Sequence, residues 1–311
     1  MTGQIAKETL FLHNAEMGLG AWAWGDRVVW HYGQGYTDDD IQAALQTALE
    51  AGINLVDTAE VYGSGRSERL LGQFIKNSAK PVLVATKFMP YPWRLTRGAM
   101  LKALQRSLER LELEHIDLYQ IHWPLPPFPI EYWVEGLAEM VKARLTHAVG
   151  VSNYDKNQMQ RAYTVLAKHD IPLASNQVEY HLLDRSIEKN GLLDRCHELG
   201  VRLIAYSPLA KALLTGKYTA DNPPPGIRGR GAAGILSRIG PLLQLMTEIG
   251  QDHRNKTPGQ VALNWVICKG ALPIPGAKTA SQAAQNAAAL GWRLTAEQVL
   301  ALDQASDKIS K

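Results

Sequence analysis

A strand-loop-helix pattern recurs eight times along the chain, and it constrains the fold more than any other feature. Each unit is a short apolar run, a polar loop, and then a stretch with apolar residues three and four positions apart. The apolar runs are predicted strands, and their lack of strict alternation is typical of parallel strands covered on both faces. The predicted strands are residues 16–19, 54–57, 82–87, 116–121, 148–152, 176–179, 203–206 and 272–274.

A helix is predicted after each strand, so the units match a parallel sheet surrounded by helices. One closed (β/α)8 barrel of the TIM type, α/β in class and spanning residues 1–311, is the simplest arrangement. An open doubly wound sheet with a second domain is the alternative, but no composition shift or linker divides the chain. The predicted helices are residues 39–51, 67–77, 98–111, 132–143, 156–168, 191–199, 257–268, 281–289 and 295–305.

Three local features add to this outline. A short β-hairpin is expected near residues 9–12, ahead of the first strand. The Gly- and Pro-rich residues 220–234 are expected to form a long loop after the seventh strand, where barrels place binding and lid segments. Closure of this loop over a cofactor is a hypothesis from its composition and position. The last helix begins with a capping-box pattern, Thr295 followed three residues later by Gln298.

The charge and cysteine content exclude several classes of function. Lys and Arg number 33 against 30 acidic residues, so a net charge of +3 does not by itself support a nucleic-acid-binding surface. Cys196 and Cys268 are far apart and lack a CxxC partner, so no disulfide framework or metal site is expected. No apolar run approaches the roughly 18 residues that span a bilayer. A cytoplasmic, soluble monomer or weak homo-oligomer is expected.

Titratable side chains follow three neighbouring predicted strands. Asp57 ends the second strand and Tyr62 follows it, Lys87 ends the third, and His122 follows the fourth. Each alone has an ordinary explanation, since a lysine at a strand end is usually solvated and a histidine among apolar residues usually lies in a core. In a barrel, however, the C-terminal strand ends meet at one rim, where catalytic residues gather. The four residues together predict a chemical site.

The motifs around these residues resemble those of the aldo-keto reductase family over nearly the whole chain. Their order and spacing are highly specific, and the arrangement looks most like the bacterial and plastid branch, which includes pyridoxal reductases. The motifs are Gly18-Leu19-Gly20-Ala21-Trp22, Asp57-Thr58-Ala59-Glu60-Val61-Tyr62-Gly63, Ala85-Thr86-Lys87, Ile116-Asp117-Leu118-Tyr119-Gln120-Ile121-His122-Trp123-Pro124, Gly150-Val151-Ser152-Asn153-Tyr154, Asn176-Gln177-Val178-Glu179-Tyr180, Ala205-Tyr206-Ser207-Pro208-Leu209 and Ile274-Pro275-Gly276-Ala277-Lys278.

The resemblance implies a barrel that binds NADPH or NADP+ without a Rossmann fold and reduces aldehydes or ketones to alcohols. Its catalytic tetrad would be Asp57, Tyr62, Lys87 and His122. A hydride added to a carbonyl carbon creates an alkoxide, so the site needs a proton donor, and Tyr62 can supply that proton. A nearby ammonium at Lys87 would lower the pKa of the phenol, and Asp57 would keep that ammonium charged. His122 would orient the carbonyl oxygen.

The cofactor contacts are also implied by the resemblance. Tyr206 would stack on the nicotinamide, and Ser152, Asn153 and Gln177 would hold its carboxamide, which suits their donors and acceptors. Ser207 and Leu209 would start the segment over the pyrophosphate. The remaining expected contacts are Gly20, Ala21, Trp22, Gly276, Lys278, Thr279, Gln282, Gln285 and Asn286.

The expected site for the adenosine 2′-phosphate departs from the family pattern. Lys278 and Thr279 offer a cation and a hydroxyl beside the free N–H groups of a helix, which favours NADPH over NADH. Many family members carry an arginine where Gln282 stands, so a planar bidentate clamp is absent and the strength of the preference stays open. Lys278 and Thr279 as ordinary helix-start residues are the alternative.

The substrate is less defined by the sequence. Trp22, Trp24 and Trp123 are expected to wall an aromatic mouth for a small carbonyl substrate, although tryptophans also serve as packing residues. A protein of another class is the alternative: the family includes potassium-channel β subunits, which keep the barrel and cofactor site but act by binding or redox sensing. The intact tetrad favours an enzyme.

Overall fold

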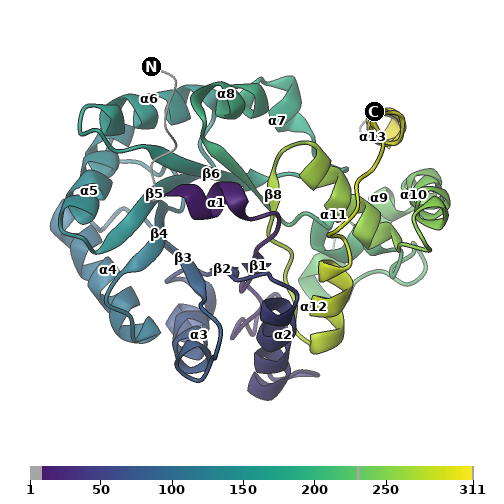
Figure 1. Ribbon diagram of the computed structural model, residues 1–311, viewed down its shortest axis with the longest axis horizontal. Coiled ribbons are helices and arrows are strands. Elements are labelled where there is room, and N and C mark those ends of the chain that lie inside the picture. The colour runs from purple at the N-terminus through teal and green to yellow at the C-terminus, as the bar shows by residue number, and fades with distance from the viewer. Residues whose placement is uncertain (1–8, 230–231, 310–311) are drawn as a thin grey trace.

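Eight parallel strands form one sheet in the order β1 to β8 in this computed structural model, which describes residues 9–229 and 232–309 (Figure 1). The predicted (β/α)8 barrel is confirmed. The strands are β1 (Leu19–Gly20), β2 (Leu55–Asp57), β3 (Leu83–Phe88), β4 (Ile116–Ile121), β5 (Thr146–Ser152), β6 (Leu173–Glu179), β7 (Arg202–Tyr206) and β8 (Leu272–Pro273).

The barrel closes where the glycine-rich first strand meets the last one. The backbone N–H groups of Gly18 and Gly20 donate to the carbonyls of Pro273 and Pro275, each at 3.0 Å. A Cβ on Gly20 would lie 2.8 Å from the Ile274 carbonyl oxygen, so a larger residue would push the two strands apart. The short β1 and β8 therefore depend on glycine for their close approach.

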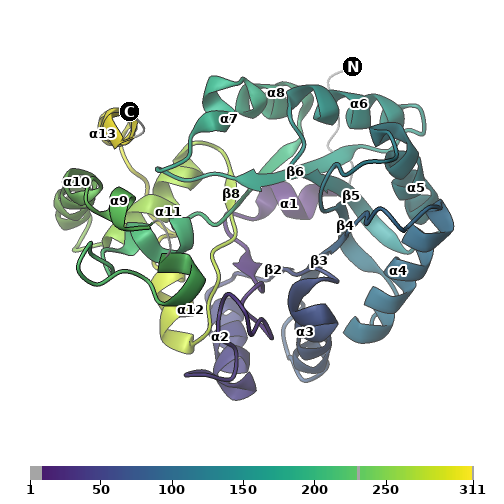
Figure 2. The ribbon, with the colours of Figure 1, turned by 180° about the vertical axis from the view of Figure 1, so that it is seen from behind.

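Helices surround the sheet on its outer side, as the views from the front and from behind show (Figures 1 and 2). None of the described helices is both long enough and apolar enough to cross a bilayer. The main helices are α2 (Asp38–Glu50), α3 (Arg66–Lys76), α4 (Arg97–Leu111), α5 (Ile130–Lys142), α6 (Lys156–Ala167), α8 (Leu192–Leu199), α11 (Pro258–Cys268), α12 (Ala280–Ala287) and α13 (Ala296–Ile309). Shorter turns are η2 (Tyr62–Gly65), η3 (Ala210–Thr215), η4 (Gly226–Gly229) and α7 (Ser186–Lys189).

The hairpin expected near residues 9–12 is wrong, because this segment forms the helix α1 (Leu10–Asn14). In Figure 1, α1 crosses the end of the barrel nearest the viewer. Leu12 of α1 is fully buried and belongs to the apolar cluster inside the barrel. The helix places Leu12 against the N-terminal end of the barrel interior. This packing favours a helix over the expected hairpin.

The segment after β7 is more ordered than the sequence suggested. The expected loop at 220–234 contains η4 and the start of α9 (Ala232–Leu236), while residues 230–231 lie outside the described part. The sequence also missed α10 (Gly240–Asp252), which begins with a Gly-Pro pair. Proline is well tolerated in the first turn of a helix, so that pair begins the helix instead of breaking it. The capping box at Thr295 and Gln298 is present, with hydrogen bonds of 3.0 and 3.2 Å.

The interior of the barrel has two layers, which follow from the two-residue period of a strand. The lower layer is apolar and includes Leu55 of β2, Ala85 of β3 and Leu118 of β4. Two residues further along these strands lie Asp57, Lys87 and Gln120, all buried. The same strand geometry thus supports a buried apolar layer at one end and a polar layer at the other.

Candidate active site

The four residues of the expected tetrad lie together at the C-terminal ends of β2, β3 and β4. Asp57 ends β2, Lys87 lies one residue before the end of β3, and His122 follows β4 directly. Tyr62 opens the turn η2, in which Gly63 has φ of 55°. A Cβ at Gly63 would lie 2.7 Å from a backbone oxygen of the β1–α2 loop, so only glycine fits there. This tight turn directs Tyr62 back toward Lys87.

Lys87 is the centre of the cluster and is fully buried. Its Nζ lies 2.5 Å from Asp57 Oδ1, 2.8 Å from the Thr58 carbonyl oxygen and 3.3 Å from Tyr62 Oη. An ammonium has three donors, and these partners use all of them. The second oxygen of Asp57 accepts from Gln177 Nε2 at 2.8 Å. The buried charge pair is therefore hydrogen-bonded on both sides, as a buried pair must be to avoid a large cost.

The surroundings of Lys87 and Tyr62 determine their charge states. Burial lowers the pKa of Lys87, but the Asp57 carboxylate and the Tyr62 oxygen outweigh it, so the net pKa is raised and the ammonium stays charged. Burial raises the pKa of Tyr62, and Lys87 offsets only part of that effect. The expected lowering of the Tyr62 pKa is therefore wrong, because the net effect of its surroundings is to raise that pKa. Tyr62 is protonated at neutral pH.

His122 is neutral at physiological pH. Burial and the nearby Lys87 ammonium lower its pKa to about 3. Its ring lies edge-on to Tyr62 with centroids 5.8 Å apart, and its buried Nδ1 lacks a hydrogen-bond partner within residues 9–229 and 232–309. A neutral imidazole has one donor nitrogen and one acceptor nitrogen, so it can donate a hydrogen bond to an oxygen without adding charge.

The residues expected around a nicotinamide form one hydrogen-bonded chain across β4 to β7. Tyr206 Oη donates to Asn153 Oδ1 at 3.0 Å, and Asn153 Nδ2 donates to the His122 carbonyl at 3.0 Å. Ser152 Oγ donates to the backbone carbonyl of Gln177 at 2.8 Å. The structure brings these residues together, but the amide nitrogen of Gln177 is engaged by Asp57.

The segment that follows Tyr206 begins with an unusual backbone. Ser207 has φ of 50°, and its carbonyl oxygen accepts from Ala210 N at 2.7 Å. Lys211 and Ala212 also have left-handed φ values, inside η3. Non-glycine residues rarely adopt this conformation, and such strain gathers at functional sites. Leu209, between these turns, is half-buried.

The three tryptophans expected at the substrate mouth differ in position. Trp22 is half-buried and lies against Tyr62, with ring centroids 6.3 Å apart. Trp123 follows His122 and is 40% exposed. Trp24 is fully buried, with its Nε1 donating to the Ala277 carbonyl at 3.0 Å and its ring against Phe74. Placing Trp24 at the mouth was therefore wrong, because the chain turns it into the core.

A second cationic region lies on the β1 and β8 side of the barrel. Lys278 Nζ donates to the Trp30 carbonyl at 3.1 Å and lies 5.0 Å from the centroid of its ring, while Arg228 lies 4.7 Å from the same ring. Burial, followed by the charges of Arg228 and Lys217, lowers the pKa of Lys278 to about 8. Several cations thus gather around Trp30 and Lys278.

The start of α12 is capped by its own side chains. Thr279 Oγ1 accepts from Gln282 N at 3.3 Å, and Gln282 Oε1 accepts from Lys278 N at 2.9 Å. Asn286 Nδ2 donates to the Gly276 carbonyl at 3.3 Å, while Gln285 is exposed. Thr279 therefore has the helix-start role that was the alternative for Lys278 and Thr279, and Gln282 caps the same helix start.

Sequence reasoning missed two contributors to the site. Gln120 Nε2 lies 3.4 Å from Asp57 Oδ2. Its position on β4, two residues before His122, could have revealed it, because residues two apart on a strand face the same side. Arg94 forms a bidentate ion pair with Glu60, at 2.5 and 3.0 Å, and also binds the Met89 carbonyl at 2.9 Å. That pair anchors the loop after β3, and no local pattern predicts it.

The chain is similar to known proteins over most of its length. Residues 16–307 match the family described as the aldo/keto reductase family. The chloroplastic pyridoxal reductase of Arabidopsis thaliana is 44% identical over 308 residues, covering 95% of this chain and 84% of the relative. A methylglyoxal reductase of Escherichia coli is 32% identical, covering 89% of this chain and 88% of the relative. Because the plant relative is described as chloroplastic, the expected cytoplasmic location stays a prediction.

A solved structure is similar as well. The aldo-keto reductase of Klebsiella pneumoniae in complex with NADPH superimposes with a TM-score of 0.74 at 32% identity, covering 93% of this chain and 90% of that one. The family match spans most of the chain, and the relatives cover it almost end to end. The expected identification as an oxidoreductase is confirmed: the chain belongs to the aldo/keto reductase family.

Proposed function

We propose that this protein reduces aldehydes and ketones to alcohols with NADPH, and that Tyr62 donates the proton. One observation carries the proposal: the protonated Tyr62 hydroxyl lies 3.3 Å from a buried ammonium and edge-on to a neutral histidine. A proton donor, a cation that stabilises its conjugate base and a neutral hydrogen-bond donor are what carbonyl reduction needs.

The residues present suit NADPH. Lys278 and Arg228 flank Trp30, and Lys217 adds a further positive charge that acts on Lys278. A phosphate monoester would relieve the repulsion among these cations, whereas the ribose hydroxyl of NADH would not. When bound, NADPH supplies the hydride that the carbonyl carbon accepts. Ser152, Asn153 and Tyr206 would hold the nicotinamide end.

The chain's own residues would manage the proton. As the carbonyl oxygen gains negative charge, it takes the proton from Tyr62 Oη, and the electron pair of that O–H bond stays on the phenolate. Lys87 stabilises the phenolate, and Asp57 keeps Lys87 charged and in place. His122 would donate a hydrogen bond to the same carbonyl oxygen and orient it. Each group favours the transition state more than the starting ketone or aldehyde.

The substrate class follows from the aromatic residues near the tetrad. Trp22 beside Tyr62, and Trp123 beside His122, would contact an apolar or aromatic carbonyl compound. Pyridoxal is an aromatic aldehyde, and a 44% identical relative is described as a pyridoxal reductase. We therefore place pyridoxal first in a panel of candidate substrates, with methylglyoxal as a small non-aromatic comparison.

The test is the loss of NADPH absorbance with this aldehyde panel, for the wild type and Tyr62→Phe. Loss of the proton donor should lower turnover by about 10²–10⁴-fold while NADPH binding is kept. Tyr163→Phe, a half-buried tyrosine of α6, is the matched control and should behave as wild type. Wild-type turnover by Tyr62→Phe would refute the proton-donor role. NADPH binding without reduction of any aldehyde would favour the binding-protein alternative.

A further inference from the structure

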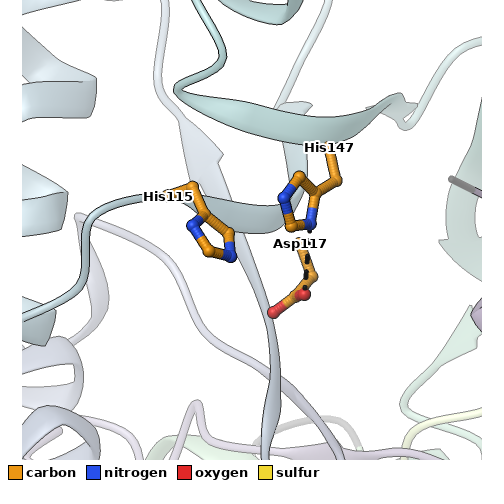
Figure 3. Close-up of side chains that lie close together, drawn as sticks. All are labelled: His115, Asp117 and His147. Atoms are coloured by element: carbon orange, nitrogen blue, oxygen red, sulfur yellow. Dashed lines mark ion pairs between the residues drawn. The ribbon is translucent and has the colours of Figure 1, made fainter.

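Three side chains that could bind a metal ion, His115, Asp117 and His147, lie close together (Figure 3). His115 immediately precedes β4, Asp117 is the second residue of β4, and His147 is the second residue of β5. One ligand atom from each lies within 4.8 Å of those of the other two. These positions are at the N-terminal strand ends, whereas the tetrad lies at the C-terminal ends.

The pairing of β4 with β5 holds the three residues on one face. Ile116 pairs with Thr146 and Leu118 with Ala148, so Asp117 and His147 are neighbours across the two strands. Leu118 and Ala148 belong to the cluster inside the barrel, so the residues before them face outward. The cluster is thus set by strand register and not by a flexible loop.

One carboxylate oxygen of Asp117 is held by a backbone hydrogen bond, and the other faces His147. Its Oδ2 accepts from the Val84 backbone N–H at 2.8 Å, and its Oδ1 lies 3.7 Å from His147 Nδ1. The two imidazole rings are 4.1 Å apart between centroids. Within the described residues, no lysine or arginine forms an ion pair with Asp117, and neither ring has a hydrogen-bond partner. The carboxylate is therefore not neutralised by a permanent cation.

The spacing suits a metal better than a direct hydrogen bond. Ligands about 2.0–2.2 Å from a tetrahedral zinc ion lie about 3.3 Å apart. The Asp117–His147 separation is 3.7 Å, and the ligand atom of His115 lies within 4.8 Å of both. The side chain of His147 is 48% exposed and that of Asp117 is 16% exposed, so an ion can enter while the carboxylate stays oriented. Two imidazoles select a transition metal over calcium or magnesium.

We propose that His115, Asp117 and His147 bind a divalent transition-metal ion such as Zn²⁺, with water completing its coordination. The apolar layer inside the barrel and the strands themselves separate this site from the tetrad. The proposal therefore does not depend on the reductase function, and the two can fail independently.

The test is calorimetric titration of the full chain, first treated with a chelator, with Zn²⁺. We expect one ion per chain for the wild type, at least tenfold weaker binding in the His115→Ala/His147→Ala double variant, and weaker binding in Asp117→Asn, which keeps the acceptor for Val84 N–H. His169→Ala is the matched control, because this histidine bonds Glu135 at 2.8 Å outside the cluster and should leave binding unchanged.

Two further measurements separate a specific site from loss of folding. Co²⁺ in place of Zn²⁺ should give visible absorption bands that the double variant lacks. Circular dichroism and aldehyde reduction of the double variant should match the wild type, because both histidines are exposed and lie at the other end of the barrel from the tetrad. Absence of stoichiometric binding, or equal binding by the double variant, would overturn the proposal.

Discussion

The two ends of the barrel interior use the same strand geometry for opposite purposes. At the N-terminal end, Leu12 of α1 packs with Leu55 and Leu118 in an apolar layer. At the C-terminal end, two residues further along the strands, Asp57 and Lys87 form a buried ion pair. One end therefore contributes burial of apolar surface, and the other holds charge at a cost in stability.

The difference shows how the apolar end supports the reactive one. The buried apolar layer beneath Lys87 gives it surroundings of low dielectric, where charges interact more strongly. The ammonium can then act on Tyr62 at 3.3 Å with little screening. Variants at the C-terminal end should therefore lower activity, whereas variants at the N-terminal end should lower only stability.

The largest effect is expected from Lys87→Met. Removal of the ammonium should lower kcat/KM for aldehydes by about 10³-fold, because the proton donor loses its charge partner. Asp57 would be left buried without its cation, so the free energy of unfolding should fall by about 3–5 kcal/mol. Steady-state kinetics and urea denaturation measure both effects. Lys76→Met, which removes an exposed lysine paired with Glu112, should change stability by less than about 1 kcal/mol.

Leu12→Ala should lower stability without lowering activity. The cavity left in the apolar layer should lower the free energy of unfolding by about 2–5 kcal/mol. Turnover per folded molecule should equal that of the wild type, because Leu12 lies at the far end of the barrel from Tyr62. Denaturation curves and kinetics well below the melting temperature check this. A large fall in turnover of the folded variant would mean that the ends are coupled.

Cofactor binding should show a smaller, pH-dependent effect at Lys278. Because its pKa is lowered to about 8, its charge is lost as pH rises from 7 to 9, and NADPH affinity should fall over this range. NADH affinity should stay nearly constant. Lys278→Gln should weaken NADPH binding about tenfold at pH 7, which corresponds to about 1.4 kcal/mol, and flatten the pH profile. Fluorescence titration with both cofactors measures this; parallel pH profiles for NADPH and NADH would contradict the assignment.

His122 should give the smallest effect. With a pKa of about 3, it is neutral throughout the range from about pH 5 to about 7.5, so kcat should vary by less than about twofold there. The check is the pH profile of kcat for the wild type beside His122→Asn. An inflection near neutral pH that disappears in His122→Asn would show that the imidazole is charged in the working enzyme.

Much of the fold and the candidate site could be predicted because their signals are local. A strand period of two and a helix period between three and four identify the repeated units, and the residues at strand ends identify Asp57, Lys87 and His122. The predictions were wrong where contacts between residues far apart in the sequence determine the local structure. The segment around Leu12 is helical because Leu12 packs into the apolar interior of the barrel. Trp24 is buried because its Nε1 donates to the Ala277 carbonyl and its ring packs against Phe74.

The sequence by itself determined the barrel, the family and the candidate catalytic residues, because periodicity and side-chain chemistry are properties of short segments. The tertiary structure decided the charge states of the site residues and which side chains lie beside one another. Burial, together with the Asp57 charge, raises the pKa of Tyr62 despite Lys87. The register of β4 and β5 places His147 beside Asp117. Dielectric environment and contacts across strands depend on residues far apart in the chain, so no local pattern contains them.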